Sequence, residues 1–171
     1  MAEIKHPQLC SDQTCTGCSA CYNSCPTDAI SMMPGAEGFY RPVVDAGKCI
    51  GCLKCERSCP VITPILPLEE QHHDEVYAAW HKDWLIRKNS SSGGAFSALA
   101  TAIIEQYHGV VYGAAYDDNM IIRHIAIDNL EDLPKLRLSK YAQSSISDTF
   151  CKIKKDLKAN RFVLFCGTPC Q

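Results

Sequence analysis

Cysteine constrains this chain more than any other residue type, because 12 of its 171 residues are cysteines. Eight of them fall into two copies of one pattern, C-x2-C-x2-C-x3-C-P. The first copy runs from Cys15 to Pro26, and the second begins 34 positions later and runs from Cys49 to Pro60. An internal repeat made of potential metal ligands predicts two related metal sites, and these sites fix the architecture of this part of the chain.

The spacing within each copy suits a cubane-type 4Fe–4S cluster. Three cysteines at intervals of three residues can wrap a short loop around three iron corners, and Gly17 and Gly51 let that loop turn tightly. The fourth cysteine lies further along the chain and, in two-cluster ferredoxins, it ligates the cluster of the other repeat. We therefore expect two ligand sets, namely Cys15, Cys18, Cys21 and Cys59 for the first cluster and Cys49, Cys52, Cys55 and Cys25 for the second.

Structural zinc and disulfides are the alternatives to iron and sulfide. Zinc uses two cysteine pairs, and a third cysteine with a fourth followed by proline has no purpose at such a site. Disulfides are disfavoured because the N-terminal segment MAEIKHPQLC contains no apolar export signal, and a reducing cytosol keeps thiols reduced. We predict a cytoplasmic iron–sulfur protein, with a zinc-stabilised interaction module as a remote alternative.

The overall composition excludes several other classes of protein. With 46% hydrophobic and 21% charged residues, the chain is expected to be globular and to hold one or two domains. With a net charge of -2, the chain lacks the excess of basic residues that is typical of nucleic-acid-binding proteins. No apolar stretch is long enough to span a membrane.

Residues 10 to 66 resemble the bacterial two-cluster ferredoxin domain, and we place this domain at residues 1–66. Between the repeats, residues 28–33 and 38–44 predict a hairpin around Pro34-Gly35. The side chains expected to shield the clusters from water are Ile30, Met32, Val43 and Ile50. The function that this resemblance implies is electron relay.

A proline-rich linker is expected to follow at residues 67–75, within a segment in which three prolines fall in eight positions. His72 and His73 in this segment are interpreted as solvated residues rather than metal ligands. Strands are then expected at 76–80, 110–116, 121–127 and 161–166, with helices between Gly94 and Gly109 and at 148–158. The fold class expected is α+β, a ferredoxin domain followed by an incomplete α/β domain of the flavin type.

Each predicted helix has an expected inward face. For the first helix these residues are Phe96, Leu99, Ala100, Ile103 and Tyr107, and for the second they are Phe150, Ile153 and Leu157.

Four segments of this second half carry another resemblance: 90–99, 109–113, 139–144 and 165–171. In this order they are similar to the N-terminal part of the coenzyme F420 hydrogenase/dehydrogenase beta-subunit family. The resemblance spans residues 76–171 and implies an oxidoreductase that binds FAD and passes electrons from iron–sulfur clusters to an organic acceptor such as a deazaflavin. Because the sequence stops just after an apolar strand, we expect it to be a fragment of a longer chain.

A serine- and glycine-rich turn at a helix start offers hydroxyls and backbone N–H groups to an anion such as a pyrophosphate. An ordinary serine cap is the alternative for this turn, and a solvated basic turn is the alternative for the segment around Lys140. The candidate cofactor-binding residues are Ser91, Ser92, Gly93, Gly94, Lys140 and Tyr141.

Four cysteines lie outside the repeats. Cys166 and Cys170 follow a strand and fit three interpretations: ligands of a further cluster, a redox thiol pair, or small residues beside a turn. Cys10 is interpreted as a spare thiol, and Cys151 as a packing residue of its helix.

The leading prediction is an iron–sulfur flavoprotein oxidoreductase with two 4Fe–4S clusters and a possible FAD. A non-catalytic electron carrier that docks a partner oxidoreductase is the main alternative. The expected partner is a redox protein or a small-molecule electron acceptor, and no catalytic side chain can be named.

Overall fold

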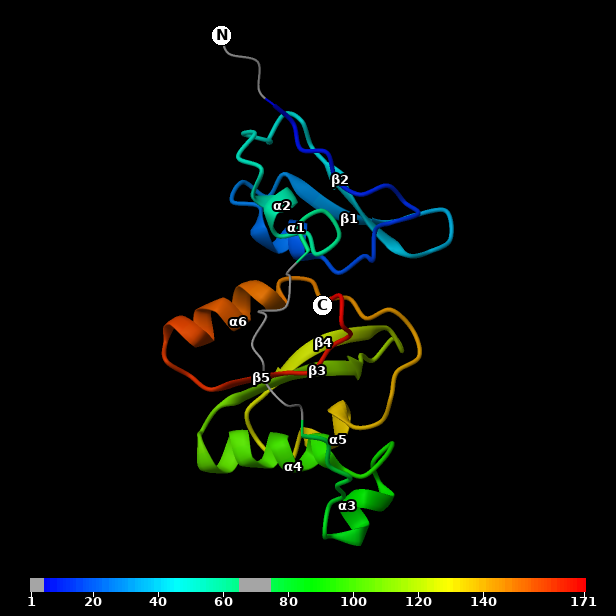
Figure 1. The fold of residues 1–171 in the computed structure, drawn as a ribbon, viewed down its shortest axis with the longest axis vertical. Coiled ribbons are helices and arrows are strands. Elements are labelled where there is room, and N and C mark those ends of the chain that lie inside the picture. Colours follow the sequence, from blue (N-terminus) through cyan, green and yellow to red (C-terminus); the bar gives the residue numbers. More distant parts are fainter. Residues whose placement is uncertain (1–4, 65–74) are drawn as a thin grey trace. The chain divides into compact units, whose positions relative to one another are not determined.

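A computed structural model of the chain describes residues 5–64 and 75–171 (Figure 1). The chain divides into two compact units, with the boundary between Glu69 and Glu70, and the last four residues, Thr168–Gln171, are grouped with the first unit. All of the expected linker except Glu75 lies outside the described residues, as do His72 and His73.

The first unit contains a hairpin and two short helices. Strands β1 (Ile30–Pro34) and β2 (Tyr40–Val44) pair in antiparallel register, with Ile30 opposite Val44, and a turn at Gly35 joins them. This confirms the predicted hairpin. Helices α1 (Ala20–Ser24) and α2 (Lys54–Arg57) pack against each other.

The backbone of the first unit repeats as its sequence does. Gly17 and Gly51 have φ angles of 67° and 68°, and Ser19 and Leu53, two positions further on, have φ angles of 64° and 55°. Positive φ is uncommon for residues other than glycine, and for a bulky residue such as leucine it is strained. Both repeats therefore adopt the same tight loop, which ends at the start of α1 or α2.

The second unit is built on a three-stranded sheet in the order β4-β3-β5. The central strand β3 (Val110–Tyr116) is antiparallel to β4 (Ile122–Ile127) and parallel to β5 (Val163–Phe165). The helices are α3 (Trp84–Lys88), α4 (Ala95–Thr101), the π-helix η1 (Ala102–Gln106), α5 (Leu133–Leu136) and α6 (Thr149–Lys158).

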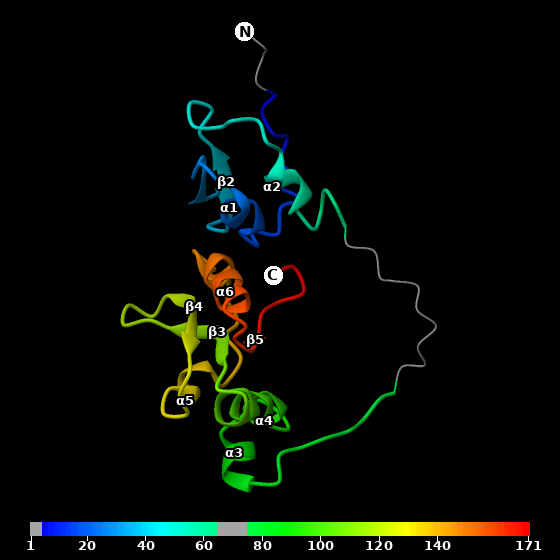
Figure 2. The same cartoon turned by 90° about the vertical axis from the view of Figure 1, so that its left-hand side faces the viewer.

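Helices cover both faces of this sheet, with α4 and α5 on one side and α6 on the other (Figures 1 and 2). The core between α4, α5 and β3 includes Ala100, Val111 and Leu133, which are at most 2% exposed. On the other face, Phe150 of α6 contacts Phe165 of β5 at 5.6 Å between ring centroids. The observed strands β3, β4 and β5 and helices α4 and α6 fall where they were predicted.

Some predicted features of the second unit are wrong. Residues 76–80 form no strand, and Val76 is 92% exposed, because the sheet offers this segment no pairing partner. Helices α3 and α5 were not predicted, since each spans barely one turn.

Several residues expected to face inward, to pack or to shield the clusters are exposed, namely Leu99, Tyr107, Leu157, Cys151, Val43 and Ile50. For Tyr107 the physical reason is the π-helix η1, which shifts the 3.6-residue period, so that this ring packs on Phe162 instead of entering the core. Leu157 lies in the last turn of α6, and Val43 lies on the outer face of the hairpin. In the described part of the chain, no helix has the length and apolarity needed to cross a membrane.

Candidate iron–sulfur centres

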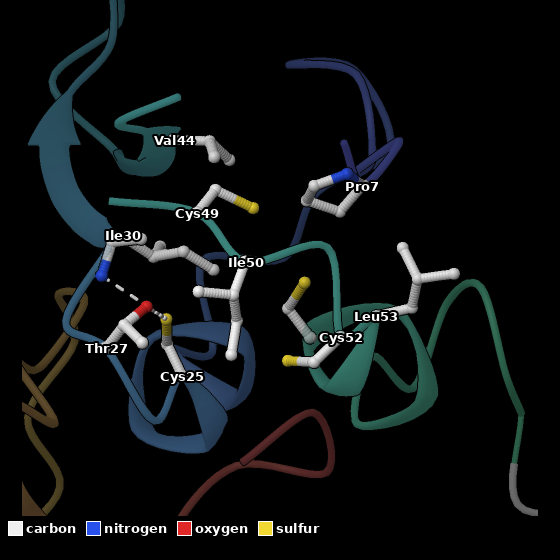
Figure 3. A pocket seen from close by; sticks show the side chains of 11 residues that line it. Pro7, Cys25, Thr27, Ile30, Val44, Cys49, Ile50, Cys52 and Leu53 are labelled. Carbon is white, nitrogen blue, oxygen red and sulfur yellow. Dashed lines mark hydrogen bonds between the residues drawn. The ribbon is translucent and has the colours of Figure 1, made fainter. Parts of the chain in front are cut away.

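The cysteines of the two repeats line two separate hollows in the first unit. One of them, which we call the second hollow, is lined by Cys25 from the first repeat and by Cys49, Cys52 and Cys55 from the second repeat (Figure 3). Its open volume is about 310 Å³, adjoining solvent included. Apolar side chains, among them Ile30, complete the wall, and Ile50 lines it although that residue is 59% exposed.

The first hollow shows the reciprocal arrangement. Cys15, Cys18 and Cys21 of the first repeat meet Cys59 of the second repeat around an open volume of about 350 Å³, adjoining solvent included. Met32 of β1 lines this hollow. A further thiol, that of Cys10, also lines it, with its sulfur 3.5 Å from the sulfur of Cys59.

Each hollow therefore takes three cysteines from one repeat and one from the other, which is the division expected from the sequence. The chain produces it because α1 and α2 pack together and each carries its following cysteine toward the loop of the opposite repeat. Figure 3 shows the sulfurs of Cys25, Cys49 and Cys52 gathered around the second hollow.

Burial and hydrogen bonds affect the thiols differently. Burial raises the pKa of Cys21 to about 12 and also raises the pKa of Cys55. Burial opposes ionisation of Cys25 as well, but hydrogen bonds from backbone N–H groups outweigh it and lower the pKa of this thiol. Burial and the neighbouring Cys59 raise the pKa of Cys10 to about 11.

The donor set fits a 4Fe–4S cluster in both hollows. Four thiols with an apolar wall are what such a cluster requires, because thiolates bind its irons and the apolar wall limits solvent access. Among the residues that the structure describes, no group of three or more His, Cys, Asp or Glu side chains lies close enough to hold a single metal ion.

Comparison with known proteins identifies this region. Residues 14–62 match the 4Fe-4S dicluster domain family. This match supports a ferredoxin-type domain in the N-terminal part of the chain, with iron–sulfur clusters and a role in electron transfer. No curated protein matches the chain.

The second unit brings together two of the segments predicted to bind a cofactor. The hydroxyl of Ser91 accepts hydrogen bonds from the backbone nitrogen of Ser139 at 2.9 Å and from its hydroxyl at 3.3 Å. Nearby in the sequence, the Nε of Arg137 donates to the hydroxyl of the buried Ser97 at 3.1 Å. The serine- and glycine-rich turn thus lies beside the basic segment around Lys140.

The other candidate cofactor residues have mixed surroundings. Lys140 directs its ammonium to the carbonyls of Lys135 and Arg137, at 3.1 and 2.6 Å, and burial lowers its pKa. Tyr141 is 95% exposed, and Ser92 is exposed too. Gly94 is buried with φ at 82°, where a Cβ would lie 3.0 Å from the Cβ of His81, and a Cβ on Gly93 would lie 2.6 Å from the carbonyl of Ala79.

Sequence reasoning missed the position of His124 in the second unit. This imidazole, which is 9% exposed, stacks on Phe165, with 5.3 Å between the rings. Its Nε2 lies 3.1 Å from the carbonyl oxygen of Cys166, which can only accept, so Nε2 carries the proton and Nδ1 accepts from the hydroxyl of Ser144 at 3.0 Å. No sequence signal marked His124, because its partners lie 20 and 42 positions away.

The two thiols of the C-terminal segment, those of Cys166 and Cys170, have different surroundings. Cys166 is exposed at the end of β5, and the sulfur of Cys170 lies 3.2 Å from the hydroxyl of Thr168.

Proposed function

We propose that this chain relays electrons through two 4Fe–4S clusters, with Cys15, Cys18, Cys21 and Cys59 ligating the first and Cys49, Cys52, Cys55 and Cys25 the second. The observation that carries the proposal is the reciprocal division of thiols between the two hollows, three from one repeat and one from the other. The match of residues 14–62 to the 4Fe-4S dicluster domain family supports it independently.

When bound, such clusters accept and release single electrons at a potential set by burial and by hydrogen bonds to sulfur. The residues of the chain provide both influences. Ile30, which is 4% exposed, and its neighbours limit the access of water to the second hollow. The backbone N–H groups of Gly17 and Ala29 lie 3.4 and 3.3 Å from the sulfurs of Cys15 and Cys25 and stabilise negative charge there.

Reconstitution of the chain with iron and sulfide under anaerobic conditions tests this proposal. We expect about eight irons and eight sulfides per chain, a broad visible absorbance that dithionite bleaches, and an EPR signal from the reduced protein. Zinc in place of iron after expression in zinc- and iron-supplemented medium, with no uptake of sulfide, would instead support the zinc-stabilised interaction module.

We further propose that the second unit is a flavin-binding domain of the coenzyme F420 hydrogenase/dehydrogenase beta-subunit type and that electrons pass from the clusters to FAD and on to an organic acceptor. The contact between Ser91 and Ser139 supports this, because it places the serine- and glycine-rich turn beside the basic segment that holds Lys140 and Tyr141. Hydroxyls and N–H groups of such a turn suit the pyrophosphate of FAD.

Titration of the reconstituted chain with FAD, followed by quenching of flavin fluorescence, tests this extension. We expect binding by the unaltered chain, at least tenfold weaker binding by the double variant Ser92→Ala/Lys140→Met, and unchanged binding by Lys154→Met, which removes an exposed lysine of α6. A chain that takes up eight irons but no FAD would be an electron carrier without a flavin.

A further inference from the structure

The first hollow contains one thiol more than a cluster requires. Cys10 lies outside both predicted ligand sets, yet it lines this hollow together with four cysteines of the repeats. Its sulfur lies 3.5 Å from that of Cys59, within the range of a hydrogen bond between thiols. A 4Fe–4S cluster offers four iron corners, so five thiols compete for four positions.

Contacts of the two residues that precede Cys10 hold it in this place. The backbone nitrogen of Gln8 donates to Oε1 of Glu56 at 2.7 Å, and Leu9 packs on the core of the first unit. The carbonyl of the same Glu56 accepts from the backbone nitrogen of Cys59 at 3.1 Å. Glu56 therefore joins the segment of Cys10 to the segment of Cys59, and both sulfurs reach the same side of the hollow.

We infer that Cys10 and Cys59 are interchangeable ligands of one iron in the first hollow, with Cys10 as the reserve. The inference rests on the proposed cluster function. Rotation about χ1 moves a cysteine sulfur between staggered positions, so with the two sulfurs 3.5 Å apart either could reach the same iron corner of a bound cluster.

The exchange of ligands balances without an oxidant. The Cys10 thiol releases its proton as its sulfur–iron bond forms, and the Cys59 sulfur takes up a proton as its own sulfur–iron bond breaks. The iron keeps its oxidation state, and the number of thiolates on the cluster stays at four.

The second hollow supplies a matched control. There the thiol of Cys25 lies near the hydroxyl of Thr27, at 3.8 Å, and the backbone nitrogen of Ala29, at 3.3 Å. The cysteines that line this hollow are the four expected ligands (Figure 3). Loss of Cys25 therefore leaves no substitute, whereas loss of Cys59 does.

The experiment measures iron and sulfide per chain after reconstitution of the whole chain and maps the thiols that iodoacetamide still modifies. We expect about eight irons in the unaltered chain, in Cys10→Ala and in Cys59→Ala, but about four in Cys25→Ala and in the double variant Cys10→Ala/Cys59→Ala. In the unaltered chain iodoacetamide should modify Cys10, and in Cys59→Ala it should not.

About four irons in Cys59→Ala, with eight in the unaltered chain, would overturn the inference and leave the proposed function intact. If Cys59→Ala is insoluble while Cys10→Ala is soluble, the inference is overturned as well, because a working reserve ligand would have kept the cluster and the fold. Absence of iron and sulfide from the unaltered chain would refute the proposed function and the inference together.

Discussion

The sulfur of Cys25 accepts a hydrogen bond from the backbone nitrogen of Ala29 at 3.3 Å, immediately before β1 begins. Cys25 belongs to the first repeat, but this bond holds its thiol at the wall of the second hollow, beside cysteines of the second repeat. The start of the hairpin between the repeats thus helps to hold a cysteine of the first repeat among the cysteines of the second.

This arrangement predicts which thiols become free when Cys25 is removed. In reconstituted Cys25→Ala, the second cluster loses its fourth ligand, so iodoacetamide should modify Cys49, Cys52 and Cys55. The thiols of Cys15, Cys18 and Cys21 should stay protected by the first cluster. Mass spectrometry of the labelled peptides provides the measurement. Labelling of Cys15, Cys18 and Cys21 instead would show that each repeat completes its own cluster.

Tyr112 provides a test of the second unit. Its buried hydroxyl donates to Oδ2 of Asp156 at 2.6 Å and so links the central strand β3 to α6. Burial, reinforced by this carboxylate, raises the pKa of the tyrosine, so the hydroxyl keeps its proton. Tyr112→Phe should lower the free energy of unfolding by about 1.5–3 kcal/mol, because a hydrogen bond to a charged group is lost.

Urea unfolding followed by tryptophan fluorescence measures that loss, since both tryptophans of the chain, Trp80 and Trp84, lie in the second unit. Tyr141→Phe is the control, because this ring is 95% exposed, and it should change nothing. Iron content should be the same in both variants. Equal stability of Tyr112→Phe and the unaltered chain would mean that the bond to Asp156 contributes nothing.

The junction between η1 and β3 has no room for a side chain at Gly109. A Cβ there would lie 2.5 Å from the carbonyl oxygen of Phe162 and 2.8 Å from Cγ2 of Ile103. Gly109→Ala should destabilise the second unit by about 1–3 kcal/mol, since neighbouring backbone must shift. In Gly113→Ala the atoms nearest to the new methyl group would be Leu136 side-chain atoms, at 3.4 Å or more, so this control should unfold near the urea concentration of the unaltered chain.

The imidazole of His124 is expected to make the stability of the second unit depend on pH. Burial lowers the pKa of this imidazole below its ordinary value of 6.5, so the folded state favours the neutral ring. As the pH falls below about 6.5, the unfolded chain takes up a proton before the folded chain does, and stability is lost. The slope for one such group is at most about 1.4 kcal/mol per pH unit.

Urea unfolding of the unaltered chain and of His124→Gln between pH 7.5 and pH 5.5 measures this dependence through the same tryptophan fluorescence. The unaltered chain should lose stability toward pH 5.5 by more than the variant does. Parallel pH profiles for the two proteins would assign the effect to other groups.

The sequence allowed most of the first unit to be predicted, because cysteine spacing specifies chemistry and local geometry together. The grouping of eight thiols around two hollows follows from that spacing, and the residues on either side of Pro34-Gly35 predicted the hairpin. The position of Cys10 did not follow, since it depends on the bond between Gln8 and Glu56, 48 positions apart.

In the second unit, apolar periodicity located the strands of the sheet but not every buried face. The 3.6-residue period of an α-helix predicted that Tyr107 lies on the buried face, but the π-helix η1 changes this period, and the order of apolar residues in the sequence does not reveal such a change. Val76 and its neighbours have strand-like composition, yet pairing is a long-range property that composition does not supply.

The matching left-handed residues Ser19 and Leu53 have a practical consequence for work on this molecule. Two loops with matching backbone conformation in one polypeptide share the same temperature, buffer and reductant, so each site serves as an internal standard for the other. Any contrast in spectrum or lability between them must originate in the side chains that differ between the two hollows, among them Cys10 in the first.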